Sequence, residues 1–224
     1  MRALVLSASP RRDGNSALLA EAAAMGVTEA GHDCELIYAD DVLKSFLRDC
    51  RKCRKLDGTC TIEDDFGRVF LDSFLPSDAF IAATPVYWYG MSAQLKAFFD
   101  RSFCYAAAPH PDSKDVVVSM MGKRIGLLIS SEETFPTVSA SIVHQMQEYC
   151  RYTHGQFVGV VHGVGNARGD IRFDPSAPLE QARRLGLEIF TTHATDYAID
   201  TPRSGRVWNM SPSQNLNEQT PHGG

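Results

Sequence analysis

Five short apolar runs alternate along the chain with segments in which apolar residues recur at helical spacing. Uninterrupted apolar runs of this length are typical of buried strands in a parallel sheet. The apolar runs lie at residues 3–7, 34–38, 79–83, 125–129 and 157–161, and the helical segments at 17–30, 63–75, 92–103, 138–152 and 179–192. This alternation predicts an α/β fold, with a doubly wound five-stranded parallel sheet between two layers of helices.

The ends and connections of these elements carry further signals. Asn15 or Ser16 is expected to cap the first helix, and Pro178 suits the first turn of the last one. Residues 40–62 are polar and rich in cysteine, and residues 105–115 are expected to form an irregular connection. The pattern therefore leaves two long segments without a predicted element.

The chain has 224 residues, enough for one large domain. We expect that domain to cover residues 1–200 and a polar tail to follow at 201–224, because this end is rich in Ser, Asn, Pro and Gly. Trp208 and Met210 could dock the tail on the body or on a partner subunit. An unstructured end fits the same composition.

The charge balance is mildly acidic, with 27 acidic and 22 basic residues and a formal net charge of −5. Such a chain lacks the basic footprint of a nucleic-acid binder. Its apolar runs are far shorter than the ~20 residues that a membrane span needs, and its first residues do not form a signal peptide. We therefore expect a cytoplasmic protein with no nucleic-acid or membrane partner.

The loop after the first strand has the chemistry of an anion site. It carries Ser9, Arg11, Asn15 and Ser16 next to the start of a helix. Free backbone amides and the helix dipole attract an anion there, and hydroxyls with a guanidinium suit a phosphate monoester. An ordinary capped turn would use similar residues. The pattern of a Walker loop is absent.

The loop after the third strand places three aromatic residues in a row, and they cannot all pack inward. Its residues are Thr84, Pro85, Val86, Tyr87, Trp88, Tyr89, Gly90 and Met91. An aromatic loop at the switch point of an α/β sheet suits a flat heteroaromatic ring, and glycine permits close backbone approach. Contact with another subunit is an alternative that is compatible with ring binding. The two loops together suit a ligand with a phosphate at one end and a flat ring at the other, as in FMN.

The segments SASPRRDGNS at 7–16, TPVY at 84–87 and SAQLKAFFDR at 92–101 resemble the flavodoxin-like NAD(P)H-dependent FMN reductases. Within that family, the chain resembles the branch that includes iron–sulfur flavoproteins. The resemblance covers about residues 1–195 and implies the strand order 2-1-3-4-5, with FMN at the switch point.

The resemblance also implies roles for individual residues. Ser9, Arg11, Asn15 and Ser16 would hold the FMN phosphate, and Pro85, Val86, Tyr87, Trp88 and Gly90 would line the ribityl chain and the ring, with Ser130 and Ser131 as further cofactor contacts. Trp88 and Tyr89 would shape the second-substrate pocket, and a homodimer or homotetramer would complete it. Glu132 and Glu133 depart from the glycine-rich sequence of relatives, so they could repel a nicotinamide nucleotide or face water.

Cys50, Cys53 and Cys60 resemble the four-cysteine motif of iron–sulfur flavoproteins, but Leu56 stands where the third ligand would fall. A cubane cluster or a structural zinc ion normally takes four ligands. We therefore assign no metal here. Three alternatives stay open: a cluster with a foreign ligand, a zinc ion, or a redox-labile pair of Cys50 and Cys53. The redox pair is considered because the basic neighbours of these thiols favour thiolates.

The predicted function is FMN-dependent transfer of a hydride from NAD(P)H to a small acceptor, such as a quinone, a flavin, a nitro compound or an azo compound. The transfer would follow ping-pong exchange, and because the cofactor carries the difficult step, we assign no catalytic acid or base. Two alternatives are open. One is an electron carrier that docks to a protein partner, and the other is a biosynthetic flavoenzyme specialised for one metabolite.

Overall fold

A computed structural model describes residues 1–54 and 57–193 of the chain. The predicted tail at 201–224, with Trp208 and Met210, lies outside the described residues, as does Leu56 of the cysteine segment. Across the described ranges, no helix combines the length and the apolar character needed to cross a membrane.

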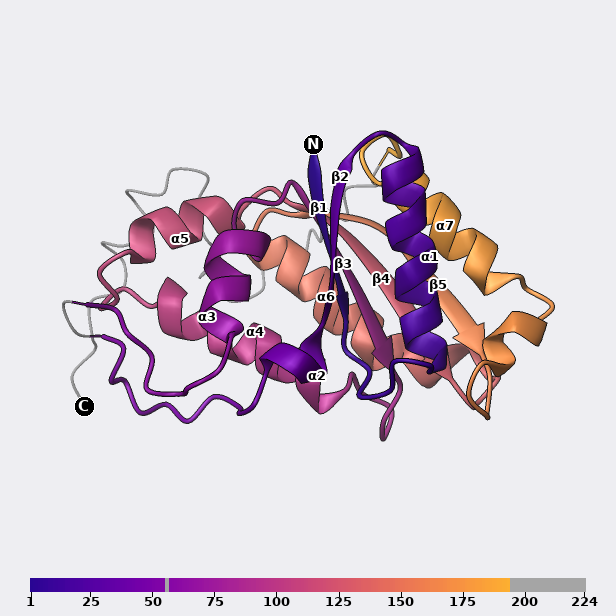
Figure 1. The fold of residues 1–224 in the computed structure, drawn as a ribbon, viewed down its shortest axis with the longest axis horizontal. Helices are drawn as coiled ribbons and strands as arrows, with labels where there is room; N and C mark the ends of the chain where they lie inside the picture. The colour runs from indigo at the N-terminus through magenta and orange to yellow at the C-terminus, as the bar shows by residue number, and fades with distance from the viewer. Residues whose placement is uncertain (55–56, 194–224) are drawn as a thin grey trace.

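The centre of the fold is a five-stranded parallel sheet with the strand order β2-β1-β3-β4-β5 (Figure 1). Its strands are β1 (Arg2–Ser7), β2 (Asp33–Tyr38), β3 (Ala79–Pro85), β4 (Arg124–Ser131) and β5 (Gln156–Val164). Central strands β1 and β3 are almost fully buried, as their continuous apolar runs predict. The predicted fold class and strand order are confirmed.

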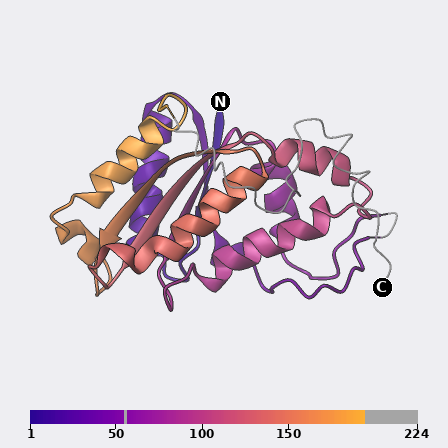
Figure 2. The same ribbon diagram turned by 180° about the vertical axis from the view of Figure 1, so that it is seen from behind.

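Helices cover both faces of the sheet and complete the three layers (Figures 1 and 2). One face carries α1 (Asn15–Glu29) and α7 (Pro178–Leu187), and the other carries α4 (Ala93–Ala106) and α6 (Ala140–Tyr152). The shorter segments are α2 (Ala39–Val42), α3 (Phe66–Arg68), α5 (Ser113–Met120), a π-helix at Val69–Phe74, and 3₁₀ turns at Pro136–Ser139 and Asp170–Phe173.

Two apolar layers, one on each face, hold the helices to the sheet. The layer beneath α4 and α6 is aromatic, since Phe66, Phe70 and Phe74 stack in sequence and Phe98 packs against Phe80 with ring centroids 5.5 Å apart. Phe66, Phe70 and Phe74 are spaced by four residues, which places them on one helical face.

The layer beneath α1 and α7 is built of smaller residues and lets these two helices approach closely. A Cβ atom on Gly26 of α1 would lie 1.9 Å from the Arg183 carbonyl oxygen, and one on Gly186 of α7 would lie 2.0 Å from the Ala23 carbonyl oxygen. Both positions therefore exclude any side chain, and the backbones of α1 and α7 are in direct contact.

Three predicted details are wrong. The helix α5 occupies part of the connection expected to be irregular, because Val116, Val117 and Met120 bury one helical face in the aromatic layer. The first helix is not capped by Asn15 or Ser16, since Gly14 holds the N-cap position. The last helix ends at Leu187 rather than at Thr192.

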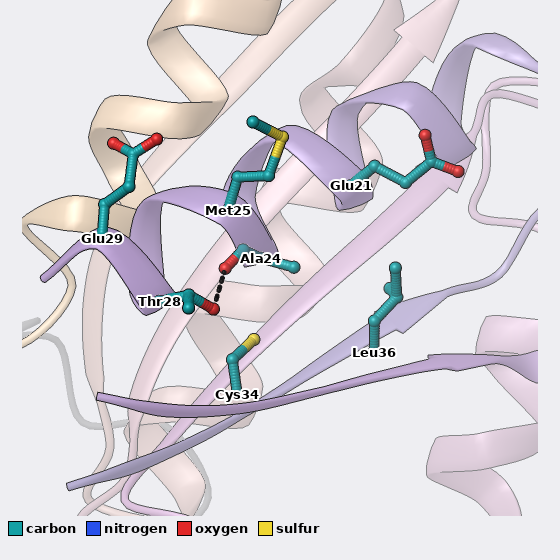
Figure 3. A pocket seen from close by; sticks show the side chains of 7 residues that line it. All are labelled: Glu21, Ala24, Met25, Thr28, Glu29, Cys34 and Leu36. Carbon is teal, nitrogen blue, oxygen red and sulfur yellow. Dashed lines mark hydrogen bonds between the residues drawn. The ribbon is translucent and has the colours of Figure 1, made fainter. Parts of the chain in front are cut away.

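A groove of about 520 Å³ opens between α1 and the edge strand β2 (Figure 3). It is lined by Glu21, Ala24, Met25, Thr28, Glu29, Cys34 and Leu36, and the Thr28 hydroxyl donates to the Ala24 carbonyl inside it. Most of this lining comes from the C-terminal part of α1 and from β2 before its carboxyl end. The groove is therefore separate from the carboxyl edge of the sheet, where the loops predicted to bind a ligand lie.

Candidate functional site

The N-terminus of α1 presents unpaired backbone donors at the carboxyl edge of the sheet. Its first intrahelical bond runs from the Leu18 amide to the Gly14 carbonyl, so the amides of Asn15, Ser16 and Ala17 have no acceptor within the helix. No side chain of the described residues caps this end, and its first turn holds no acidic residue. This set of donors suits an anion.

The loop before α1 is closed by short-range contacts. The Ser9 side chain is 5% exposed, and its hydroxyl oxygen accepts a hydrogen bond from the Arg11 amide at 3.1 Å. A Cβ atom on Gly14 would lie 3.1 Å from the Arg11 carbonyl oxygen and 3.3 Å from the Ser9 hydroxyl. Glycine therefore lets the chain turn tightly into the helix with the loop already formed.

Buried serines fix this loop to the neighbouring strands. The hydroxyls of Ser16 and Ser130 are 2.7 Å apart and both buried, and the Ser130 carbonyl accepts from the Val86 amide at 2.9 Å. At the end of β1, the Ser7 hydroxyl is fully buried and has no hydrogen-bond partner within the described part of the chain. An orphaned buried hydroxyl on the residue that leads into this loop fits a site that is completed by a ligand.

The two arginines of this loop differ in their contacts. Arg12 forms an ion pair with Asp41 and lies over the Tyr38 ring, with its guanidinium carbon 4.0 Å from the ring centroid. Arg11 is exposed, and no carboxylate among residues 1–54 and 57–193 pairs with it. Arg11 is therefore the guanidinium of this loop that is available to an anionic ligand.

The Asn15 side chain contacts a different loop. Its amide nitrogen donates to the carbonyls of Gly165 and Ala167 at 2.9 and 3.1 Å, and its oxygen accepts from the amides of Gly169 and Ile171 at 2.9 and 3.3 Å. This loop follows β5 and lies about 150 positions after Asn15 in the sequence. No local sequence pattern predicts this contact.

The aromatic loop after β3 forms a tight turn with left-handed backbone at two large residues. Tyr87 and Gly90 exchange two backbone hydrogen bonds of 3.0 Å, and Trp88 and Tyr89 between them have φ angles of 49° and 59°. The residue that carries the unusual backbone is therefore not Gly90, whose Cβ would meet only the Tyr87 carbonyl, at 3.6 Å. Aromatic residues rarely adopt this conformation.

Contacts from the loop after β4 and from the start of α6 hold this turn in place. The Tyr89 hydroxyl donates to the Glu133 carboxylate at 3.1 Å, its ring packs near Phe135, and the Ser141 hydroxyl donates to the Tyr89 carbonyl. The bond to Glu133 raises the pKa of the Tyr89 phenol. Within residues 1–54 and 57–193, no contact of this kind holds the Trp88 ring, which is 97% exposed.

The base of the turn is fixed to the sheet. Pro85 ends β3 and Val86 packs partly against the aromatic layer. The Ser92 amide donates to the Thr84 hydroxyl at 2.9 Å, and the Ser92 hydroxyl donates to the Ala8 carbonyl at 2.7 Å. These bonds tie the aromatic loop to the loop after β1, so the two predicted binding segments form one continuous edge.

Ser131 and His162 meet at the carboxyl ends of β4 and β5. The Ser131 hydroxyl donates to the Glu133 carbonyl at 2.7 Å and lies 2.6 Å from the His162 Nε2 atom. With its proton committed to that carbonyl, the hydroxyl accepts from Nε2–H. Burial lowers the pKa of His162, although nearby Asp174 opposes the shift. The lowered pKa favours the neutral form of His162, whose hydrogen bond orients Ser131.

The three clustered cysteines differ in their surroundings, and two of them, Cys53 and Cys60, lie near Cys104 of α4. Cys50 is exposed and its sulfur lies 3.9 Å from the Thr61 hydroxyl, whereas Cys53 is buried against Cys104 of α4. Burial, with Cys53 nearby, raises the pKa of Cys104 to about 12. No three Cys, His, Asp or Glu side chains in the described ranges are placed to hold a metal ion.

A buried ion pair anchors the end of the cysteine segment. Arg101 of α4 donates two hydrogen bonds to Asp64, and both side chains are at most 2% exposed. Burial opposes the ionisation of Asp64, but the bonds from Arg101 and from backbone amides outweigh it and lower the pKa of this carboxyl. The pair fixes this segment to the body independently of any metal.

The carboxyl edge thus combines open helix amides, buried serines and an available guanidinium at one end with an aromatic turn at the other. Together with the strand order 2-1-3-4-5, this edge defines a flavodoxin-like protein. Over residues 1–156 the chain matches the family described as NADPH-dependent FMN reductase. The chain belongs to this family. It is an FMN-dependent oxidoreductase with NAD(P)H as its co-substrate.

Curated relatives agree with this assignment. The chain is 30% identical over 186 residues to YwqN of Bacillus subtilis, which carries the name NAD(P)H-dependent FMN-containing oxidoreductase. The alignment covers 83% of this chain and 96% of YwqN. It is 31% identical over 193 residues to an iron–sulfur flavoprotein of Methanocaldococcus jannaschii, with 84% and 95% covered.

Solved structures show the same fold at lower identity. An NAD(P)H:quinone oxidoreductase of Methanothermobacter marburgensis superposes with a TM-score of 0.62 at 20% identity, covering 86% of this chain and 98% of that one. The azoreductase AzrA superposes with a TM-score of 0.57 at 18% identity, covering 84% and 100%. At this identity, the likeness concerns the fold alone.

Proposed function

We propose that the chain binds the FMN phosphate at the N-terminus of α1 and the flavin ring beside the aromatic turn, and reduces small planar acceptors there. The observation that carries this proposal is the uncapped α1 N-terminus, whose three free amides directly follow the loop that carries Ser9 and Arg11. Ser7, whose buried hydroxyl has no partner among the described residues, leads into that loop. A helix end with this donor set suits a phosphate dianion.

Ring binding is proposed for the loops after β3 and β4. Pro85, Val86, Tyr87 and Gly90 would line one side, and Ser130 with Ser131 the other, since the Val86 amide already bonds the Ser130 carbonyl. Aromatic and backbone groups of this kind hold flat heteroaromatic ligands by stacking and hydrogen bonding. The fixed base of the turn, through Ser92 and Thr84, supports a preformed wall.

When bound, FMN supplies the hydride chemistry between NAD(P)H and the acceptor. The contribution of the chain is to bind, orient and exclude water. Arg11 and the α1 amides would fix the phosphate, the edge between the two loops would set the tilt of the ring, and Trp88 with Tyr89 would shape the space for the second substrate. No side chain is assigned as an obligatory acid or base.

The acceptors that fit this proposal are flat and aromatic, such as quinones, free flavins, nitro compounds and azo compounds. Two structural neighbours are named for quinone and azo reduction, and their fold is the one found here. Exposed aromatic side chains at the turn would stack on such a ring. The Glu133 carboxylate accepts a hydrogen bond from the Tyr89 hydroxyl. This bond supports a position of the carboxylate in the wall of the pocket, turned away from the acceptor.

An anaerobic titration of the FMN-loaded protein tests this function. We expect NADH or NADPH to bleach the flavin absorbance and a benzoquinone to restore it. Flavin that stays oxidised under excess of both nucleotides, while dithionite reduces it, would overturn the reductase proposal in favour of an electron carrier.

Trp88→Ala is expected to raise the KM for the quinone, and Phe103→Ala, which removes another exposed aromatic ring on α4, serves as the matched control.

We further propose that two copies associate through the aromatic turn. Trp88, Tyr89 and Phe135 are 97%, 50% and 40% exposed, and the Tyr89 and Phe135 rings lie together. A second chain would cover this apolar surface and close the acceptor pocket. Light scattering after size exclusion should give a dimer or tetramer that Trp88→Ala weakens and Phe103→Ala does not. A monomeric wild-type protein would contradict this association.

A further inference from the structure

We infer that Asn15 is a positioning residue that couples the FMN phosphate site to the loop after β5, rather than a phosphate ligand through its side chain. The inference rests on the proposed phosphate site at the α1 N-terminus. It begins from the hydrogen bonds of one carboxamide that joins residues about 150 positions apart in the sequence.

The hydrogen-bonding capacity of the Asn15 side chain is already used. An amide side chain has two N–H donors and an oxygen with two lone pairs. Both donors bind carbonyls, of Gly165 and Ala167, and both lone pairs receive amides, of Gly169 and Ile171. No donor of this side chain is left for a phosphate oxygen. Its backbone amide, in the first turn of α1, stays available.

The loop is shaped around this carboxamide. A Cβ atom on Gly165 would lie 2.8 Å from the Asn15 amide nitrogen and 2.8 Å from the Ile171 amide. The Gly165 amide also donates to the Ser131 carbonyl at 2.9 Å, which ties the loop to the end of β4. The Gly165–Ile171 loop therefore contacts both α1 and the end of β4. The residues that follow β4, Glu133 among them, contact the aromatic turn.

The four hydrogen bonds of the Asn15 side chain form a clamp between α1 and this loop. A second contact between the same two segments lies outside the clamp. Arg168 pairs with Asp13 at 2.9 Å, but the two side chains are 59% and 64% exposed. An ion pair this exposed is worth little because solvent screens it. The coupling therefore depends on the four bonds of Asn15, which set the direction of the first helical turn and hence of its free amides.

The consequence is a reciprocal linkage between ligand and loop. If an ordered Gly165–Ile171 loop favours the geometry of the α1 amides that binds phosphate, then bound phosphate must stabilise the loop by the same free energy. Riboflavin, which has no phosphate, should not stabilise it. A comparison of FMN with riboflavin therefore distinguishes this linkage, which needs the phosphate, from a general stabilisation of the fold by flavin binding.

The test breaks the clamp from each side. Asn15→Ala removes the carboxamide, and Gly165→Ala leaves Asn15 intact but forces its partner away. The control is Gly159→Ala in β5, where the added Cβ would make an ordinary 3.6 Å contact with Leu185. FMN and riboflavin affinities are measured by flavin fluorescence, and hydrogen exchange is followed over residues 163–174.

We expect both clamp variants to lose about tenfold in FMN affinity, the equivalent of one or two hydrogen bonds, with less than about a twofold change for riboflavin. FMN should slow exchange of the loop in the wild type and in Gly159→Ala, but not in the clamp variants. Asn15→Ser offers a milder replacement if Asn15→Ala folds poorly.

Three outcomes separate the claims. A loss of FMN affinity in Asn15→Ala with none in Gly165→Ala would identify a direct phosphate contact and overturn the positioning role. Equal losses for FMN and riboflavin in both variants would overturn the coupling to phosphate. A wild-type protein that binds FMN and riboflavin equally would instead refute the proposed phosphate site itself.

Discussion

The two ends of the candidate site are built on opposite principles. At the phosphate end, Ser9, Gly14 and Ser16 are buried and held by short hydrogen bonds. At the aromatic end, Trp88 is almost fully exposed and its backbone is left-handed. The first end is ready to receive a ligand without rearrangement, whereas the second presents an apolar side chain that a ligand or a second copy would cover.

This difference suggests a division of labour. A preformed, buried site loses little entropy when it binds, so it supplies affinity. An exposed, strained turn persists only where the surroundings fix it, and such strain collects at functional positions. We therefore expect changes at the phosphate end to act on FMN affinity and on stability, and changes at the aromatic end to act on the acceptor.

The largest expected effect is on FMN binding. Arg11→Ala removes the available guanidinium and should weaken FMN by about 1.5–3 kcal/mol, the range for a hydrogen bond to a charged group. Riboflavin affinity should not change. Arg12→Ala is the matched control, since Arg12 is already paired with Asp41. Unchanged FMN affinity in Arg11→Ala, measured by fluorescence titration, would mean that the helix amides and hydroxyls carry the phosphate alone.

The second effect concerns stability at the phosphate end. Ser16→Ala leaves the Ser130 hydroxyl without its buried partner at 2.7 Å and should lower the free energy of unfolding by about 1–3 kcal/mol. Urea denaturation of the FMN-free protein measures it. Thr28→Ala, which loses an exposed hydrogen bond on the same helix, should cost much less. Equal costs for the two variants would argue against a preformed phosphate end.

The third effect has the opposite sign. Trp88→Gly places a residue that tolerates left-handed backbone at a position where φ is 49°, and should raise the free energy of unfolding of the dissociated subunit by about 1 kcal/mol. The same variant should raise the KM for quinone. A destabilised Trp88→Gly protein would mean that the indole makes contacts in solution that outweigh the backbone strain.

The smallest effect is a titration. The pKa of Tyr89 is raised because its hydroxyl donates to Glu133, so the bond contributes below the raised pKa and is lost as the pH rises through it. Glu133→Gln should therefore let the phenol ionise at lower pH. Difference absorbance near the tyrosinate band measures this, with Tyr89→Phe identifying the signal. The same titration curve in wild type and Glu133→Gln would exclude this bond.

The sequence predicts the sheet well because each strand is encoded locally, by a continuous apolar run such as residues 79–83 or 125–129. The order of the strands came from resemblance to a family. The helix α5 was missed, since the consecutive valines 116–118 have low helix propensity and only burial of Val116 and Val117 decides the conformation.

The site shows the same limit. Residue type identified Ser9 and Ser16 as candidates, and the structure brings them to one edge. Residue type also suggested Asn15 as a cap, yet its partners lie about 150 positions later in the chain and no local pattern announces them. The left-handed turn at Trp88 and Tyr89 was equally hidden, because both residues ordinarily avoid that backbone.

The direct contact between α1 and α7 has a consequence for how the protein is made. The first helix of the chain packs through Gly26 against the last described helix, and its starting residue is held by the loop after β5. Synthesis proceeds from the N-terminus, so these partners leave the ribosome long after α1 does. The phosphate end can therefore be completed only when nearly the whole domain has emerged, and loading of the cofactor would mark the end of folding rather than its start.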